Sequence, residues 1–428
     1  MALPSASLPN QMPKWGDLKA AYLLFAEVEV TYKELTKPHF LNTYERASLQ
    51  GQGYILFIQD TTEIDYTTRK CTQGLSHIGD GKGQGMLLHS TLVAIPGLVP
   101  KLLGLAAGKV WTRAKETRHG KETPTERTKR PTEGDNWAES LERIGRAPDV
   151  TSGTTWVSVG DRASDVFSYL VRAAALGWHC LLRVTQNRMI IDELGVTKKL
   201  KDYARSLNAQ TEILHALRGR DGKPKREVLL SVAYAPVTLL MPKLKNPKNG
   251  ENSIQAWAIR VFEPEPSKGT KAIEWILLST LPVTTNEEAF TRVNWYRHRW
   301  LIEEYHKCLK SGCQVEKRQL KTADSLMALI GMLSVVAVFL LSLRNMSREL
   351  PDEPAIKYVP ADVVKVIALR SQKSPEQLNV RQFFREVAML GGFIGRKSDG
   401  DPGWQTIWKG WLRVQDMCEA LQLASNKG

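Results

Sequence analysis

Three carboxylates that are far apart in the sequence occupy positions typical of metal ligands in an α/β fold. Asp60 and Asp161 follow the apolar runs YILFIQ and TTWVSVG, which have the composition of buried strands. Glu303 belongs to NWYRHRWLIEEYHKCLKSG, residues 294–312, which has no helix breaker before its last residue and predicts a helix. Aspartates that end neighbouring strands meet at one edge of a sheet, where a glutamate on a helix can join them. Three such oxygen donors suit Mg²⁺ or Mn²⁺ and phosphoryl transfer.

The predicted helix places one phenol and several cations on the same face as Glu303. Residues four or seven apart share a face of an α-helix, and these positions are Tyr296, Arg299, Lys307 and Lys310. The stripe could bind a metal ion and the phosphates around it. An exposed helix face with ordinary ion pairs has the same pattern, so the stripe alone does not establish a site.

Other carboxylates near the two strands are alternative ligands. Glu63 and Asp65 follow Asp60 closely, and Asp165 follows Asp161. Each strand-end aspartate could also be a turn former. Asp165→Ala and Glu304→Ala are therefore expected to leave most activity intact.

The charge balance favours a polyanionic partner. The chain has 59 Lys and Arg against 45 Asp and Glu, a net charge of +14. Nucleic acid is the first candidate and an acidic membrane surface the second. The five cysteines form no C-x-x-C pair, which excludes the common zinc motifs and is typical of a reducing cytoplasm. The first residues lack the pattern of a secretory signal.

Two segments suggest other functions but lack the context these need. Residues 326–343 carry no charge over 18 positions, which is the lower limit for a membrane span. The run contains glycine and serine and stands alone, so we expect a buried core helix and no membrane. The glycine-rich loop GDGKGQG, residues 79–85, lacks the Gly-Lys-Ser/Thr ending and precedes a strand, so it does not predict a nucleotide site.

The order of predicted elements indicates an α/β fold with additions. Short helices are expected in the first residues. Strands are predicted at YILFIQ, MLLHSTLVAI and TTWVSVG, followed by the amphipathic helix DVFSYLVRAAALGW and the strand HCLLRVT. From about residue 186 to 282, β-type runs joined by basic turns predict a β-rich insertion. The prolines between 351 and 360 mark a linker to a helical C-terminal region.

The motifs around these residues match a known family. The spacing of Tyr296, Arg299, Glu303 and Lys310 is the signature Tyr-x-x-Arg-x-x-x-Glu-x-x-x-x-x-x-Lys, and QDTTEIDY and VGDRASD resemble two aspartate motifs. The chain resembles bacterial cut-and-paste DDE transposases of the insertion-sequence-four family, from about residue 15 to the C-terminus.

The resemblance implies a fold and a catalytic set. The fold is an RNase-H-like catalytic core interrupted by a β-rich insertion, with a short helical N-terminal segment and a helical C-terminal region. Asp60, Asp161 and Glu303 would be catalytic and would bind Mg²⁺, with Mn²⁺ possible. The reaction would be cleavage at transposon ends through a hairpin, followed by strand transfer into target DNA.

The resemblance also implies DNA contacts. Tyr296, Arg299 and Lys310 would hold phosphates of the cleaved strand. Arg183 and Trp275 would hold the DNA hairpin and a base flipped from the stack, which an aromatic ring can accommodate. Trp275 lies in the run IEWILLS, where a tryptophan can instead be a core residue.

Domains and partners follow from the same resemblance. Residues 1–50 would be the remnant of a helical DNA-binding domain, 51–350 the catalytic domain with its insertion at 186–282, and 351–428 a helical dimerisation region. The partners would be double-stranded DNA, at transposon ends and target, and a second copy of the chain. The location would be the bacterial cytoplasm, at the nucleoid.

The C-terminal region contains an aromatic stripe. Trp404, Trp408 and Trp411 follow helical spacing within the segments DPGW and IWKGW, which resemble the dimerisation region of the family. The stripe should pack either on its own catalytic domain or on a second copy, and the resemblance favours the second copy.

Two alternative functions share these features. Family members usually carry a longer basic helical domain at the front, and Leu23 stands where arginine is common. The chain could therefore be a shortened, non-catalytic regulator that dimerises with full-length transposase and inhibits it. A metal-dependent nuclease without strand transfer would use the same site and differ in its products.

Overall fold

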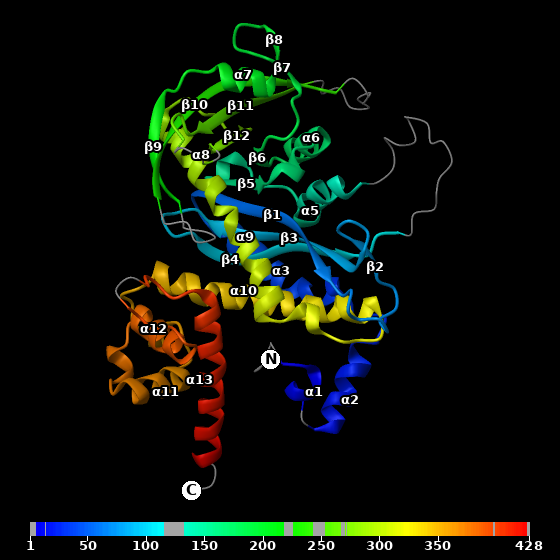
Figure 1. The fold of residues 1–428 in the computed structure, drawn as a ribbon, viewed down its shortest axis with the longest axis vertical. Helices are drawn as coiled ribbons and strands as arrows, with labels where there is room; N and C mark the ends of the chain where they lie inside the picture. The colour runs from blue at the N-terminus through cyan, green and yellow to red at the C-terminus, as the bar shows by residue number, and fades with distance from the viewer. Residues whose placement is uncertain are drawn as a thin grey trace. The chain divides into compact units, whose positions relative to one another are not determined.

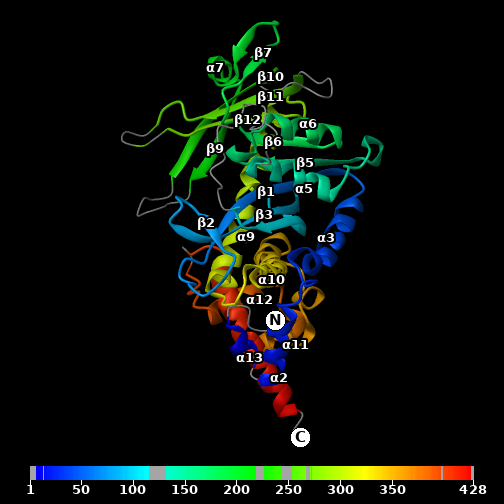
Figure 2. The same cartoon turned by 90° about the vertical axis from the view of Figure 1, so that its right-hand side faces the viewer.

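The computed structural model has a mixed α/β fold with parallel and antiparallel strand pairs and a helical C-terminal region (Figures 1 and 2). It describes residues 6–12, 14–114, 132–217, 226–242, 253–266, 270, 272–396 and 399–425. The chain forms two compact units. The first consists of Met1–Glu45, Thr61–Lys115 and Leu301–Gly428, and the second of Arg46–Asp60 and Glu116–Trp300.

The second unit is organised around a mixed sheet. Its parallel part is formed by the first half of β1 (Gly53–Asp65), by β5 (Thr154–Gly160) and by β6 (His179–Arg183). Antiparallel pairing continues from β6 through β12 (Glu274–Ser279), β11 (Ser253–Phe262) and β10 (Arg226–Leu240). The remaining strands are β7 (Met189–Ile191), β8 (Thr197–Lys199) and β9 (Thr211–Leu217). The β-type runs of residues 186–282 therefore extend the sheet of the parallel strands through the β6–β12 pair.

One face of this sheet packs on α6 (Phe167–Ala175). The Tyr169 hydroxyl lies 2.7 Å from Ser158 Oγ, and the amide of Gln59 donates to the same oxygen at 2.8 Å. Phe57 stacks edge-on against Trp178 in the apolar part of this face. These buried polar groups are hydrogen-bonded to each other, which offsets the free-energy cost of removing them from water.

The opposite face packs on α8 (Asn286–His298). The ring of Tyr54, on β1, lies 4.6 Å from that of Trp295, on α8. Arg292 is buried and stacks over Trp295 at 4.4 Å. We call this side of the sheet the α8 face.

The first unit contains an antiparallel sheet and a long apolar helix. The strands are β2 (Ser76–Ile78), β3 (Gly83–Ile95) and β4 (Lys101–Trp111), and the N-terminal helices are α1 (Leu8–Gln11), α2 (Trp15–Leu24) and α3 (Tyr32–Ser48). The helix predicted over 326–343 is part of α10 (Ala323–Glu349). A Cβ at Gly331 would lie 3.2 Å from the backbone of Tyr32, so this glycine allows the start of α3 to approach α10.

Within the described residues, α10 is the helix that is long and apolar enough to cross a membrane. However, 67% of its apolar window is buried inside the protein. Leu326, Leu333 and Leu341 are fully buried. In the first unit α10 therefore has the burial of a core helix.

The C-terminal region consists of α11 (Ala361–Ser371), α12 (Val380–Leu390) and α13 (Trp404–Ser425), which lie beside α10 in Figure 1. Trp404, Trp408 and Trp411 are all buried. The Trp411 ring lies 6.1 Å from that of Phe339 and 6.3 Å from that of Phe383. The aromatic stripe therefore packs inside its own chain, and not on a second copy as the resemblance favoured.

The expectation that Asp60 ends its strand is wrong. The strand β1 continues to Asp65, five residues further. The apolar run stops at Ile58, but the following Thr61, Thr62 and Ile64 are β-branched and favour a strand as well. By contrast, β5 ends at Gly160, so Asp161 does follow directly on its strand.

Candidate active site

The pleat of β1 determines where the Asp60 carboxylate points. Successive side chains of a strand alternate between the two faces. Because Tyr54 packs on the α8 face, the residues at two-residue steps from it also face α8, namely Leu56, Ile58 and Asp60. Asp60 is thus the polar end of an otherwise apolar row.

The same reasoning places Asp161 on the α8 face. Ile58 is the direct partner of Val159 in the parallel β1–β5 pair, and direct partners project to the same face. Asp161 is two residues after Val159 and has extended backbone angles, which continue the alternation. Its Oδ1 accepts a hydrogen bond from the backbone N–H of Ala163 at 2.8 Å, which orients the carboxylate.

Arg183 and Trp275 follow on the next two strands. Val159 is the partner of Leu181 on β6, so Arg183, two residues later, shares the α8 face. Arg183 is in turn the partner of Leu277 on β12, which puts Trp275 on that face as well. The contact of the Trp275 ring with Tyr296, at 6.1 Å between centroids, agrees with this placement.

The end of α8 carries the phenol and cation that face these strands. Arg299 is the C-cap residue of α8, and its Nη1 lies 4.0 Å from Asp60 Oδ2. The guanidinium carbon is 5.9 Å from the ring of Tyr296. Arg299 thus lies between the phenol and the Asp60 carboxylate, within reach of a phosphate oxygen placed there.

Burial controls the protonation of Tyr296. It raises the pKa of the phenol, while the cations Arg299 and Arg183 act in the opposite direction. The phenol therefore keeps its proton at neutral pH and can donate a hydrogen bond. Burial lowers the pKa of Arg183, which the Tyr296 hydroxyl partly offsets. A guanidinium stays charged even so, because its pKa starts far above neutrality.

Glu303 belongs to the first unit, on α9 (Trp300–Lys307). Its neighbour Glu304 forms an ion pair with Arg344, which is buried on α10. Glu303 is half-buried. Glu304 therefore has a structural role, because it is the partner of a buried arginine.

The single helix predicted over 294–312 is wrong in detail. The segment consists of α8, then α9, and then a π-helical turn, Cys308–Gly312. A π turn contains more residues than an α turn, so positions beyond it no longer keep the seven-residue alignment with Glu303. Lys310 lies in this turn, with its Nζ 3.5 Å from Glu316 Oε1. Its contact with DNA phosphates stays a prediction.

The alternative carboxylates have structural partners. Asp165 is buried and forms an ion pair with Arg188. In the first unit, Glu63 accepts a hydrogen bond from the N–H of Gly79 at 2.8 Å. Hydrogen bonds from the side chain and then the backbone N–H of Thr67 lower the pKa of Asp65. Asp165 is engaged by its ion pair, and Glu63 and Asp65 accept backbone hydrogen bonds within the first unit.

The site residues of the second unit suit a hard divalent cation only in part. Asp60 and Asp161 supply two carboxylates on one face, and oxygen ligands are what Mg²⁺ prefers. Among the described residues of either unit, no three His, Cys, Asp or Glu side chains lie close enough together to hold a metal ion. Glu303 as the third ligand stays a prediction.

Comparison with known families decides the class of protein. Residues 121–340, just over half of the chain, match the model of the transposase DDE domain. The chain belongs to the transposase DDE domain family. Asp161 and Glu303 lie within the matched residues, and Asp60 lies before them. Membership of the DDE family implies an RNase-H-like core, phosphoryl transfer on DNA and, in general, divalent metal ions.

Sequence reasoning missed the cations on the other side of Arg183. Arg162, Lys201 and Arg205 line a cavity with Glu274 in the second unit of this DDE family member. Lys201 and Arg205 are four residues apart on one helix, which is the signal that could have revealed them.

Replacing Arg299 by glutamine should weaken DNA binding without removing the fold. The variant loses a cation beside Asp60, so the slope of the logarithm of the binding constant against the logarithm of the salt concentration should fall by about the amount expected for one phosphate contact. The measurement is the dissociation constant for cleaved-end DNA across a salt series. Arg297→Gln, an exposed change two residues earlier, is the matched control. An Arg299→Gln slope equal to that of the control would show that Arg299 does not contact DNA.

Proposed function

We propose that this chain is a DNA transposase that cuts at transposon ends and joins the freed 3′ ends to target DNA. The observation that carries the proposal is the α8 face in a DDE family member. Two carboxylates, Asp60 and Asp161, share this face with the cations Arg183 and Arg299. Such a surface suits a nucleic acid phosphate held against acidic groups that bind metal.

Within the family, we propose the insertion-sequence-four group and a mechanism like that of the Tn-five transposase, with a hairpin intermediate. The Tyr-Arg-Glu-Lys spacing supports this assignment. So does Trp275, which is half-buried beside Tyr296 and so is not sealed in a core. Its exposed part could stack on a flipped base, and Arg183 would hold the adjacent backbone.

The residues that would hold divalent metal are Asp60, Asp161 and Glu303. Bound Mg²⁺ or Mn²⁺ supplies activation of the attacking hydroxyl and neutralisation of the developing negative charge. Arg299 would bind a phosphate oxygen beside Asp60. The protonated Tyr296 would donate a hydrogen bond to the same phosphate and so orient it.

The domain roles and the assembly are part of the proposal. Residues 1–50 would contact DNA, 51–350 would form the catalytic domain with its insertion at 186–282, and 351–428 would dimerise. Because the tryptophan stripe is buried, the dimer surface would be elsewhere, and the exposed Leu423 near the end of α13 is a candidate for it. The protein would act in the bacterial cytoplasm, at the nucleoid.

The decisive experiment uses purified full-length chain, Mg²⁺ and a DNA fragment that carries the genomic sequences on both sides of the coding region. Denaturing gels would separate nicked strands, hairpins and strand-transfer products. Hairpins and joined products are expected for the transposase. Cleavage without joined products would indicate a nuclease. Binding without cleavage, together with inhibition of an active transposase, would indicate the shortened regulator.

A further inference from the structure

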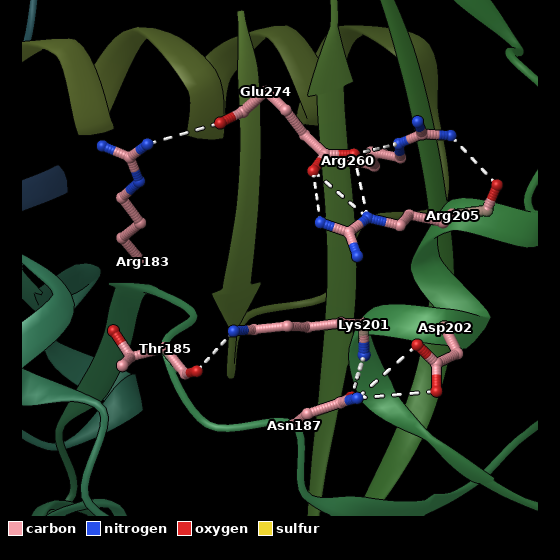
Figure 3. Close-up of polar contacts among 8 residues, drawn as sticks. All are labelled: Arg183, Thr185, Asn187, Lys201, Asp202, Arg205, Arg260 and Glu274. Atoms are coloured by element: carbon pink, nitrogen blue, oxygen red, sulfur yellow. Dashed lines mark hydrogen bonds and ion pairs between the residues drawn. The ribbon is translucent and has the colours of Figure 1, made fainter.

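A polar cavity lies in the second unit, next to β6. Its volume is about 220 Å³, and its lining comes from the 3₁₀ turn Arg162–Ser164, β6, α7 (Leu200–Ser206) and β12, with the segment that follows β6. This is the volume open to the centre of a water-sized sphere, of which a single water molecule needs only about 10–15 Å³. The cavity therefore has room for a phosphate group with part of its hydration. Figure 3 shows most of the polar side chains around it.

The charge of the lining is strongly positive. Four cations, Arg162, Arg183, Lys201 and Arg205, face a single carboxylate, that of Glu274. Neighbouring like charges are unfavourable unless an anion lies between them. The lining therefore has the charge of an anion site.

The one carboxylate is already engaged by two guanidinium groups. Arg205 Nη2 lies 2.6 Å from Glu274 Oε2, and Arg260 Nε lies 3.1 Å from Oε1 (Figure 3). The hydrogen bond from Arg205 is the main reason that the pKa of Glu274 is lowered. Glu274 thus holds Arg205 in place and has little capacity left to neutralise the other cations.

Lys201 is held by a neutral group. Its ammonium donates to the backbone carbonyl of Thr185, as Figure 3 shows. A carbonyl positions an ammonium without cancelling its charge. Lys201 and Arg205 are one turn apart on α7, so both cations lie on one side of the helix.

Arg183 links this cavity to the α8 face. It lines the cavity and donates to the backbone carbonyl of Glu274 at 3.3 Å. It also interacts electrostatically with Tyr296 on the α8 face and with Arg162. Arg162, in turn, directly follows Asp161 in the chain. A strand that leaves the acidic groups would therefore meet the cavity through these two arginines.

We infer that the cavity binds a backbone phosphate of the DNA strand, beyond the nucleotides held at the α8 face. Lys201 and Arg205 donate to the phosphate oxygens, and Glu274 orients Arg205. This inference rests on the proposed function, because it takes DNA as the anion. A flexible ammonium beside a planar guanidinium fork suits a phosphodiester, which offers two unesterified oxygens.

The test compares variants of the full chain that change one charge of the cavity. The probe is a fluorescent thymidine homopolymer of about ten nucleotides, within the usual range of single-strand sites. Lys201→Met should weaken binding about tenfold, as expected for one charge-assisted hydrogen bond. It should also reduce the salt slope by about 0.7, the value for one phosphate of a single strand. Arg205→Gln should act in the same direction.

Glu274→Gln should have the opposite effect. Glutamine keeps a side-chain oxygen that can accept the hydrogen bond from Arg205, but it removes the one negative charge of the lining, so the homopolymer should bind roughly threefold more tightly or better. Lys199→Met is the matched control, because Lys199 is exposed and only two residues from Lys201. A cavity that serves only folding would give no tightening on Glu274→Gln.

Two outcomes would overturn the inference. One is binding by Lys201→Met and Arg205→Gln that equals binding by Lys199→Met. The other is a Glu274→Gln variant that binds no more tightly than the unmodified chain. Failure of the proposed function is distinguishable, since the unmodified chain would then neither cleave transposon-end DNA nor bind the homopolymer.

Discussion

Asp161→Asn should reduce DNA cleavage by roughly three orders of magnitude or more while the protein stays folded. A metal ligand contributes several kcal/mol of charge stabilisation in the transition state, and about 1.4 kcal/mol corresponds to a tenfold change in rate. The asparagine keeps an oxygen for the hydrogen bond from Ala163, so the turn after β5 is preserved. Asp60→Asn and Glu303→Gln should have comparable effects.

Single-turnover cleavage of end DNA measures the loss, and thermal unfolding checks the fold. Binding of non-specific DNA should be retained, because the substituted groups are not cations. Glu287→Gln is the control, since Glu287 is an exposed acid on the first turn of α8. A variant that still cleaves at the original rate would remove that residue from the site.

Asp165→Ala should destabilise the protein by about 3–5 kcal/mol, which is the usual cost of leaving a buried charge without its partner. The side chain of Asp165 is 1% exposed, and that of its partner Arg188 is 7% exposed. Asp165 also accepts hydrogen bonds from the N–H groups of Thr185 and Gln186, each at 2.7 Å. Asp165 therefore has a structural role, and its place outside the metal site stays a prediction.

Urea unfolding of the variants measures this effect. Arg188→Met alone should also be destabilising, because it leaves the carboxylate unpaired. The double variant Asp165→Asn, Arg188→Met should lose less stability than the sum of the single changes, since neither charge is then left alone. An unchanged urea midpoint for Asp165→Ala would contradict the importance of the pair.

Local sequence patterns predicted much of the fold. The apolar run before Asp60, the amphipathic helix that became α6 and the charge-free segment of α10 all appear as expected. The continuation of β1 to Asp65 and the π turn at Cys308–Gly312 were not foreseen. Both depend on pairing and packing with distant parts of the chain, which a window of neighbouring residues does not contain.

The candidate site, too, could be predicted from local sequence patterns only in part. The spacing of Tyr296 and Arg299 in one helical stretch could be read directly. That Arg183 shares a face with Asp161 required the β5–β6 register, which only the folded sheet provides. Arg188 as the partner of Asp165, and Glu274 as the partner of Arg205, join residues separated by loops, so no local pattern could have indicated them.

The alternation along β1 and β5 has a consequence for tolerated changes in length. Inserting or deleting one residue between Tyr54 and Asp60 would turn the carboxylate to the α6 face, among Phe57 and its aromatic neighbours. Between Asp60 and Asp161, the strands β2, β3 and β4 must keep their own alternation, but the described loops that join them, such as residues 96–100, can change in length without turning either carboxylate to the other face. We therefore expect functional homologues to vary widely in the distance between these two acids, yet to keep the short strand segments that precede them free of insertions and deletions.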